Sequence, residues 1–335
     1  KPPGSLGKLE DMAVRMAGVT GRVCPEVRKC RVAVFAADNG GGAEGGSCAP
    51  QSVTVQQAVN MTRHKTGMSA LAAYFGDQVQ VVDVGICVPV SCPQVLDRKV
   101  RFSTGDIAAE PAMTEQEALR ALSVGLDLAH MAKEEGIDAV GVGEMGIGNT
   151  TTSAAVLAAL TGASVEDVTG RGGGLTDGGF ATKKRVLRQA LALHHPDPGD
   201  PVAVLAAVGG LDLAAMTGLF LGCAHEGLAA AVDGYISIVA ALCAVRLCPR
   251  VRDYLFLSHA SYEIGYRLAA RELELEPCLL LGMRLGEGSG CPLLFRILQG
   301  ACAVLDGMAT FPEAAIEDEY LTPIRQGDAF TVDKS

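Results

Sequence analysis

The sequence predicts an α/β fold in which helices cover both faces of a mostly parallel sheet. Three short apolar runs of buried-strand length each end in turn residues: Val32–Ala37, Val79–Val82 and Ile137–Val142. Glycine-rich loops and helical patterns follow these runs, and this alternation is typical of parallel, Rossmann-like sheets. Ligands bind beyond the carboxyl ends of such strands, where Asp38, Asp83 and Glu144 fall.

The first predicted strand runs into a long glycine-rich loop, Ala37–Pro50, and a helix is expected to begin near Ser52. The small side chains of this loop suit the wall of a pocket for a flat ligand. A mobile surface loop is the alternative, and the residues alone leave both open.

The clearest helix lies between the second and third predicted strands. Thr114 is its expected N-cap, Glu117 completes a capping box with Thr114, and Gly136 ends the helix. Helical spacing predicts that four apolar residues share its buried face: Leu119, Leu122, Leu126 and Ala129.

Two glycine-rich loops follow the third predicted strand. The first, Gly143–Thr152, enters a small-residue helix, so its backbone N–H groups and the positive end of the helix dipole could bind an anion. No Lys follows Gly148, which argues against a Walker A loop. In and after the second loop, Gly170–Leu175, Arg171 and Lys183 could neutralise a monophosphate. Tight turns made for packing are the alternative for both loops.

The stretch 202–222 is almost wholly apolar, which raises the question of a membrane span. Asp212 lies at its centre, and the pair Gly209 and Gly210 interrupts the run. We therefore predict two buried helices and no span.

The late loop Arg284–Cys291 places one acid, Glu287, among three glycines. This pattern indicates either a solvated turn or a base held on backbone that a substrate can approach closely. The six histidines show no paired ligand spacing, and His259 alone predicts no site. We therefore predict no metal site, and no cofactor is expected. No GxSxG sequence is present, which argues against a hydrolase triad.

The chain ends are less regular than the middle. We expect residues 31–285 to form a large α/β domain that carries the phosphate-binding loops. Residues 1–30 and 286–335 are expected to form a small, mainly helical domain.

Composition is typical of a compact cytoplasmic enzyme. The 335 residues carry a net charge of −10, so no cationic surface is predicted for nucleic acid or anionic membranes. Eleven cysteines without a CxxC pair or a secretory leader indicate reduced intracellular thiols.

Eight segments, taken together and in this order, match one family: KPPGSLGKLE (1–10), NMTRHKTG (60–67), VVDVGI (81–86), EPAMT (110–114), GVGEMGIGNTT (141–151), DGYISIVAAL (233–242), SHASYE (258–263) and RLGEGSG (284–290). Through them the whole chain resembles the nicotinate-nucleotide:dimethylbenzimidazole phosphoribosyltransferases, which activate the lower ligand of cobamides. The resemblance implies an α/β domain, a small domain made from both chain ends, and a dimer.

The resemblance also implies the reaction. Nicotinate mononucleotide gives its 5-phosphoribosyl group to an aromatic base, which yields an α-riboside 5′-phosphate and nicotinate without a cofactor. Glu287 matches the general base of the family. Matches to the nucleotide side are Glu144, Gly146, Gly148, Asn149, Thr150, Gly172, Lys183 and Ser261, of which Ser261 corresponds to a residue from the partner subunit. Matches to the lower-ligand side are Ala49, Pro50, Gln57 and Leu285.

Four positions depart from the common family pattern: Asn39, Cys48, Ala49 and Asp106. They leave open whether the acceptor is dimethylbenzimidazole, another benzimidazole, a purine or a phenolic compound. Homodimer and heterodimer stay open as well. The alternatives to an active homodimeric enzyme are one subunit of a heterodimer that activates phenolic ligands, a partner that completes the other subunit's site, and a nucleotide sensor without chemistry.

Overall fold

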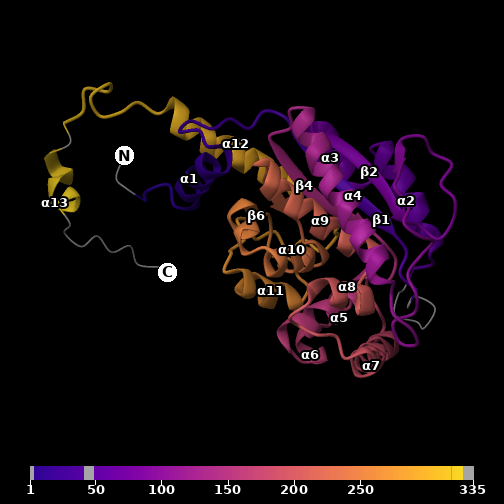
Figure 1. Ribbon diagram of the computed structural model, residues 1–335. Helices are drawn as coiled ribbons and strands as arrows, with labels where there is room; N and C mark the ends of the chain where they lie inside the picture. Colours follow the sequence, from indigo (N-terminus) through magenta and orange to yellow (C-terminus); the bar gives the residue numbers. More distant parts are fainter. Residues whose placement is uncertain (1–3, 41–48, 318, 327–335) are drawn as a thin grey trace.

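Six parallel strands form one sheet in the order β3-β2-β1-β4-β5-β6 (Figure 1). The computed structural model describes residues 4–40, 49–317 and 319–326. The strands are β1 (Cys30–Ala37), β2 (Gln78–Gly85), β3 (Val95–Asp97), β4 (Ala139–Met145), β5 (Ala229–Val232) and β6 (Leu255–Leu257). The order reverses between β1 and β4, and the carboxyl edge at such a reversal is where open α/β sheets bind ligands.

Two sets of helices cover the two faces of the sheet, as predicted. On one face α9 (Leu211–Glu226) and α10 (Tyr235–Leu247) contact the strands, and α4 (Glu115–Glu134) packs on α9, while α5 (Asn149–Thr161) and α8 (Pro201–Val208) pack against α10. The other carries α1 (Lys8–Thr20), α2 (Ser52–Thr62), α3 (Gly67–Phe75) and α12 (Cys291–Gly307). All eight residues of β1 are buried between these layers, which explains why its sequence is apolar apart from Arg31.

The remaining helices lie outside these two layers or near the chain end: α6 (Val165–Val168), α7 (Asp177–His194), η2 (Pro249–Tyr254), α11 (Gly265–Leu273), η3 (Glu319–Leu321) and α13 (Thr322–Arg325). In Figure 1 α7 lies at the bottom of the molecule beside α5 and α6.

The predicted capping box of α4 is confirmed, because Thr114 accepts the backbone N–H of Glu117 and the Glu117 carboxylate accepts that of Thr114. The predicted buried face is partly wrong, since Leu119 and Leu126 are exposed. Backbone contact with α9 is the reason: a Cβ at Gly125 would lie 2.0 Å from the Ala215 carbonyl oxygen. At so close a crossing the small residues face α9, and the larger leucines remain at its rim.

The apolar stretch 202–222 forms α8 and most of α9, as predicted, and the pair of glycines separates them. Asp212 is fully buried in the first turn of α9. Among the residues that the structure describes, no helix is both long and apolar enough to cross a membrane.

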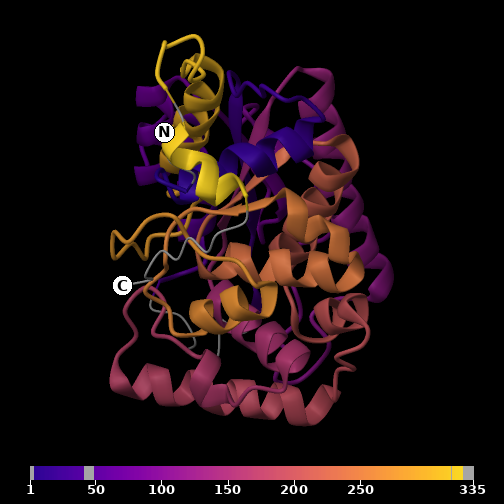
Figure 2. The same cartoon turned by 90° about the vertical axis from the view of Figure 1, so that its left-hand side faces the viewer.

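The first helix of the chain packs against a late one, since α1 contacts α12 (Figures 1 and 2). α12 also contacts β4 and β5, so it is part of the layer that covers the sheet. The division into a domain of residues 31–285 and a smaller one of 1–30 with 286–335 stays a prediction.

Candidate active site

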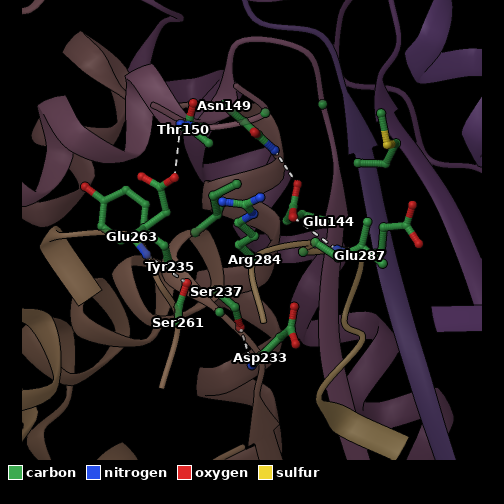
Figure 3. A pocket seen from close by; sticks show the side chains of 18 of the residues that line it. Glu144, Asn149, Thr150, Asp233, Tyr235, Ser237, Ser261, Glu263, Arg284 and Glu287 are labelled. Carbon is green, nitrogen blue, oxygen red and sulfur yellow. Dashed lines mark hydrogen bonds between the residues drawn. The ribbon is translucent and has the colours of Figure 1, made fainter. Parts of the chain in front are cut away.

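The carboxyl ends of β4, β5 and β6 border an open cavity of about 260 Å³ (Figure 3). The glycine-rich loop that leads into α5 forms one side, and the loop that carries Arg284 and Glu287 forms another. Gln57 of α2 also lines it. Segments far apart in the sequence therefore meet where the strand order predicts a ligand site.

Backbone conformation holds Glu287 against the sheet. Gly286, Glu287 and Gly288 have φ values of 80°, 64° and 86°, and this left-handed region is costly for a residue with a side chain. A Cβ at Gly286 would lie 2.4 Å from Glu144 Oε1, and one at Gly143 would lie 2.4 Å from the Glu287 carbonyl oxygen. Close approach of the backbone therefore requires glycine at positions 286 and 143. Glu287, which has a side chain, takes a strained conformation.

The Glu287 carboxylate is buried in the cavity wall, and the residue is only 6% exposed. One oxygen accepts Gln57 Nε2 at 3.4 Å, and the other accepts the backbone N–H of Met68 at 3.4 Å. A solvated turn is thereby excluded. The carboxylate is held by long hydrogen bonds and can accept a proton from a group inside the cavity.

A buried acidic network lies beside Glu287. Glu144 accepts the backbone N–H of Glu287 at 3.3 Å, and Asn149 Nδ2 donates to both Glu144 and Asp212 (Figure 3). Burial raises the pKa of Glu144 to about 8 and that of Asp212 to about 6. Burial likewise raises the pKa of Asp233, at the end of β5, to about 7. The region around Glu287 is therefore rich in carboxyl groups that lie close to their titration range at neutral pH.

The N-terminus of α5 forms the opposite end of the cavity. Gly148 precedes the helix at φ 94°, and Thr150 lies in its first turn. Arg171 and Arg284 line the cavity, the guanidinium of Arg171 is paired with Asp177 at 2.5 Å, and Figure 3 shows Arg284 between Thr150 and Glu144. The positive end of the α5 helix dipole and a nearby guanidinium group together suit a phosphate.

The structure brings most of the predicted site residues into one cavity. Eleven line it: Ala49, Gln57, Glu144, Gly146, Gly148, Asn149, Thr150, Gly172, Ser261, Leu285 and Glu287. Pro50 is exposed and does not line this cavity. Lys183 is fully buried behind the lining, where its Nζ donates to Thr150 Oγ1 at 2.9 Å and to the Gly170 carbonyl at 3.2 Å. Ser261 reaches the cavity of its own chain, so its role across a subunit interface stays a prediction.

The positions that depart from the family pattern differ in where they lie relative to the cavity. Asn39 is buried, and its Oδ1 accepts Thr152 Oγ1 at 3.2 Å. Asp106 accepts the backbone N–H of Ala108. Neither residue lines the cavity, whereas Ala49 does, and Cys48 lies outside the described residues.

Sequence reasoning assigned no role to several residues that line the cavity, foremost Asp233, Glu263, Arg284 and Tyr235. Asp233 directly follows a strand, as Glu144 ends one, so its position offered a usable signal. Its strand is only four residues long and contains three alanines, which hid that signal. Among the described residues, no group of three or more His, Cys, Asp or Glu side chains is arranged to hold a metal ion.

A parallel α/β fold, an anion-binding helix end and buried carboxyl groups facing it define an enzyme class that acts on small phosphorylated molecules. A family model described as phosphoribosyltransferase matches residues 1–316. The chain belongs to the nicotinate-nucleotide–dimethylbenzimidazole phosphoribosyltransferase family and is a phosphoribosyltransferase.

Curated relatives with that name match over nearly their whole length. The protein of Clostridium perfringens is 46% identical over 332 residues, covering 99% of this chain and 92% of the relative. That of Geobacter sulfurreducens is 48% identical over 322 residues, covering 96% and 92%. The crystal structure of CobT from Thermus thermophilus is 42% identical, with a TM-score of 0.91 over 95% of each chain. The predicted family and fold class are thus confirmed.

Proposed function

We propose that the enzyme transfers the 5-phosphoribosyl group of nicotinate mononucleotide to an aromatic lower-ligand base. The products are nicotinate and an α-riboside 5′-phosphate. The names of the relatives supply the donor and dimethylbenzimidazole as an acceptor. The observation that carries the proposal is the position of Glu287, buried in the wall of a cavity whose other end is the α5 N-terminus.

The polarity of the cavity matches the donor. The phosphate is negative, and the N-terminus of α5, together with Arg284, favours negative charge. The nicotinate ring nitrogen is positive while it is bonded to ribose, and positive charge also develops at C1 of ribose as that bond breaks. The Glu287 carboxylate lines the part of the cavity that favours such charge.

The proposed step balances without a further reactant. A ring nitrogen of the base attacks C1 of ribose, on the face opposite nicotinate, which inverts the configuration from β to α. The C1–N bond to nicotinate breaks, and its electron pair neutralises the pyridinium nitrogen. The Glu287 carboxylate takes the N–H proton of the incoming azole, which would otherwise leave the product ring positively charged.

The acceptor side is built around Glu287. Gln57 contacts its carboxylate, and Leu285 and Ala49 line the same cavity. A planar ring placed between these residues would present its N–H to Glu287. Small Ala49 leaves room for substituents on the ring, so benzimidazoles, purines and phenolic compounds all remain acceptors to be tested.

The decisive experiment incubates the isolated protein with nicotinate mononucleotide and a mixture of dimethylbenzimidazole, other benzimidazoles, adenine and phenol. Mass spectrometry then identifies the riboside phosphates that form. We expect at least one α-riboside phosphate and an equal amount of nicotinate. No product from any acceptor would contradict an enzyme that acts alone. Product that appears only after a paralogous subunit is added would support the heterodimer.

A further inference from the structure

Asp233 clamps the loop that carries the proposed base. Its Oδ2 accepts the backbone N–H of Gly288 at 3.1 Å, and its Oδ1 accepts that of Gly290 at 2.7 Å. The two donors flank Ser289 and directly follow Glu287. One carboxylate therefore restrains the backbone next to the base by two hydrogen bonds, each of the stronger, charge-assisted kind while Asp233 is ionised.

The clamp is itself fixed to the sheet. Asp233 follows β5, its backbone N–H donates to Ser237 Oγ at 3.2 Å, and Ser258 Oγ donates to its carbonyl oxygen at 3.1 Å. Ser237 Oγ is also placed to donate to the carbonyl of Val142 in β4 at 3.3 Å. Asp233 is 2% exposed, so its carboxylate has little freedom to turn away.

The loop needs such a restraint, because its backbone is strained where the base sits. Glu287 has a φ of 64° between two glycines that also have positive φ, and a residue with a side chain keeps that conformation only when its surroundings impose it. Glu144 holds the N–H of Glu287 itself, and Asp233 holds the two donors that follow it. Relaxation of the backbone toward negative φ would turn the carboxylate of Glu287.

We propose that Asp233 is a positioning residue for the transfer reaction, which sets the direction of the Glu287 carboxylate through the backbone of Gly288 and Gly290. This inference rests on the proposed function, because it gives Asp233 no task other than to orient the base. Asp233 makes no proton transfer of its own.

The test is a double-mutant cycle of D233N and E287Q. An amide offers one acceptor oxygen to two N–H donors, so D233N loses one hydrogen bond and sets its own NH₂ against the other donor. We expect kcat to fall about 10–10²-fold, as a small misplacement of a catalytic group does, while each KM changes less than about 3-fold. In the E287Q background, D233N should lower kcat by less than about 2-fold, because the group it positions is already gone.

Asp138 supplies a matched control. Its Oδ2 accepts the backbone N–H groups of Arg28 and Lys29 at 2.8 and 2.9 Å, at the opposite edge of the sheet. Because one oxygen accepts both N–H groups, D138N keeps its acceptor and removes only the charge of a loop-binding aspartate far from the cavity, and it should leave kcat within about 2-fold. An equal loss of kcat in D138N would show that removing the charge of any such aspartate impairs turnover, and it would overturn the specific role of Asp233.

Hydrogen exchange of residues 286–290 gives a readout that needs no activity. We expect faster exchange at Gly288 and Gly290 in D233N, and unchanged exchange there in D138N. If D233N does not fold, D233S keeps one acceptor in a smaller side chain and carries the same predictions. The inference would be overturned if D233N kept the wild-type kcat, or if D233N lowered kcat by the same factor with and without E287Q. Unchanged hydrogen exchange at Gly288 and Gly290 would also overturn it.

A wild-type protein without turnover would instead contradict the proposed function. The exchange rates would then still test whether Asp233 restrains the loop.

Discussion

The two edges of the central sheet both carry acidic residues, but these residues have different partners. At the amino edge, Asp77 forms an ion pair with Arg296 at 2.5 Å, and Asp138 accepts two backbone N–H groups of the segment before β1. At the carboxyl edge, Glu144 and Asp233 are buried, and within the described residues neither forms an ion pair with Lys or Arg. Backbone and amide N–H groups of the loops stabilise them instead.

The contrast lies between Asp77, which is paired with an arginine, and Glu144 and Asp233, which are buried and accept N–H groups; Asp138 also accepts N–H groups but is only partly buried. A lysine or arginine partner neutralises a carboxylate and leaves it no charge to offer a substrate. An N–H partner adds no opposite charge, so burial raises the pKa of the carboxyl group toward neutrality and the group can gain or lose a proton there. Position at the carboxyl edge does not by itself determine the partner of an acid. Asp83 lies near the end of β2 at that edge and is nevertheless paired with Lys99 at 2.8 Å.

Replacement of Glu287, the proposed base at the carboxyl edge, is the strongest test of this contrast between the two edges. In E287Q the amide keeps the size of the side chain and cannot take a proton, so kcat should fall about 10²–10⁴-fold with dimethylbenzimidazole. Steady-state kinetics at saturating nicotinate mononucleotide measures the loss, with thermal unfolding as the control for folding. Nearly full turnover in a folded variant would remove Glu287 as the base.

The anion end of the cavity can be tested through Lys183. Burial lowers its pKa to about 8, and its Nζ supports Thr150 and the Gly170 carbonyl behind the phosphate end. In K183M we expect the KM for nicotinate mononucleotide to rise about 10-fold, and the KM for the base to change less than about 2-fold. The neighbouring K184M is the control, since Lys184 lies over the Phe180 ring and not behind Thr150. Equal rises in both KM values would count against a phosphate role.

Whether a strand of the sheet could be predicted from the sequence depends on how many residues it contains. β1, β2 and β4 have seven or eight residues that include apolar, β-branched side chains and could be predicted, whereas β3 and β6 have three residues each and the sequence of β5 is AAAV. Such short strands owe their conformation to their neighbours in the sheet and not to their own propensity.

Prediction of the site from the sequence is limited in the same way, because only local patterns are visible in the sequence. The glycine-rich loop before α5 indicates an anion site by its local pattern, which the sequence alone displays. The contact between Glu144 and Glu287 joins residues 143 positions apart, and only the order of the strands creates it. The family resemblance supplied Glu287 as the base, and it gave no indication that Asp233 clamps its loop.

Titration offers a further contrast between the edges. The pKa values of Glu144 and Asp233 are raised to about 8 and about 7, so between pH 6.5 and 8 the folded state binds more protons than the unfolded state. Stability should therefore fall as pH rises through this window. His259, whose pKa burial lowers to about 4, and Lys183, whose pKa burial lowers to about 8, act in the opposite direction, His259 below about pH 7.5 and Lys183 above about pH 7.

We expect the midpoint of thermal unfolding to drop by about 2–5 °C from pH 6.5 to 8 in the wild-type protein. In E144Q the drop should be smaller, because the neutral amide does not titrate. Calorimetry at closely spaced pH values measures both curves. A wild-type midpoint that rises across this window would show that the buried acids are ionised throughout, and it would contradict the assigned direction of their pKa shifts.

The smallest expected effect on turnover lies at the amino edge. D77N removes the charge opposite Arg296, which also donates to the Phe75 carbonyl, so the variant should lose about 1–3 kcal/mol of unfolding free energy. Its kcat should stay within about 2-fold of wild type, because Asp77 does not contact the cavity. Urea unfolding and steady-state kinetics on one preparation compare the two quantities directly. A large loss of kcat would mean that α12, which begins one residue after Gly290, transmits changes at Arg296 to the Glu287 loop, and the two edges would then not be independent.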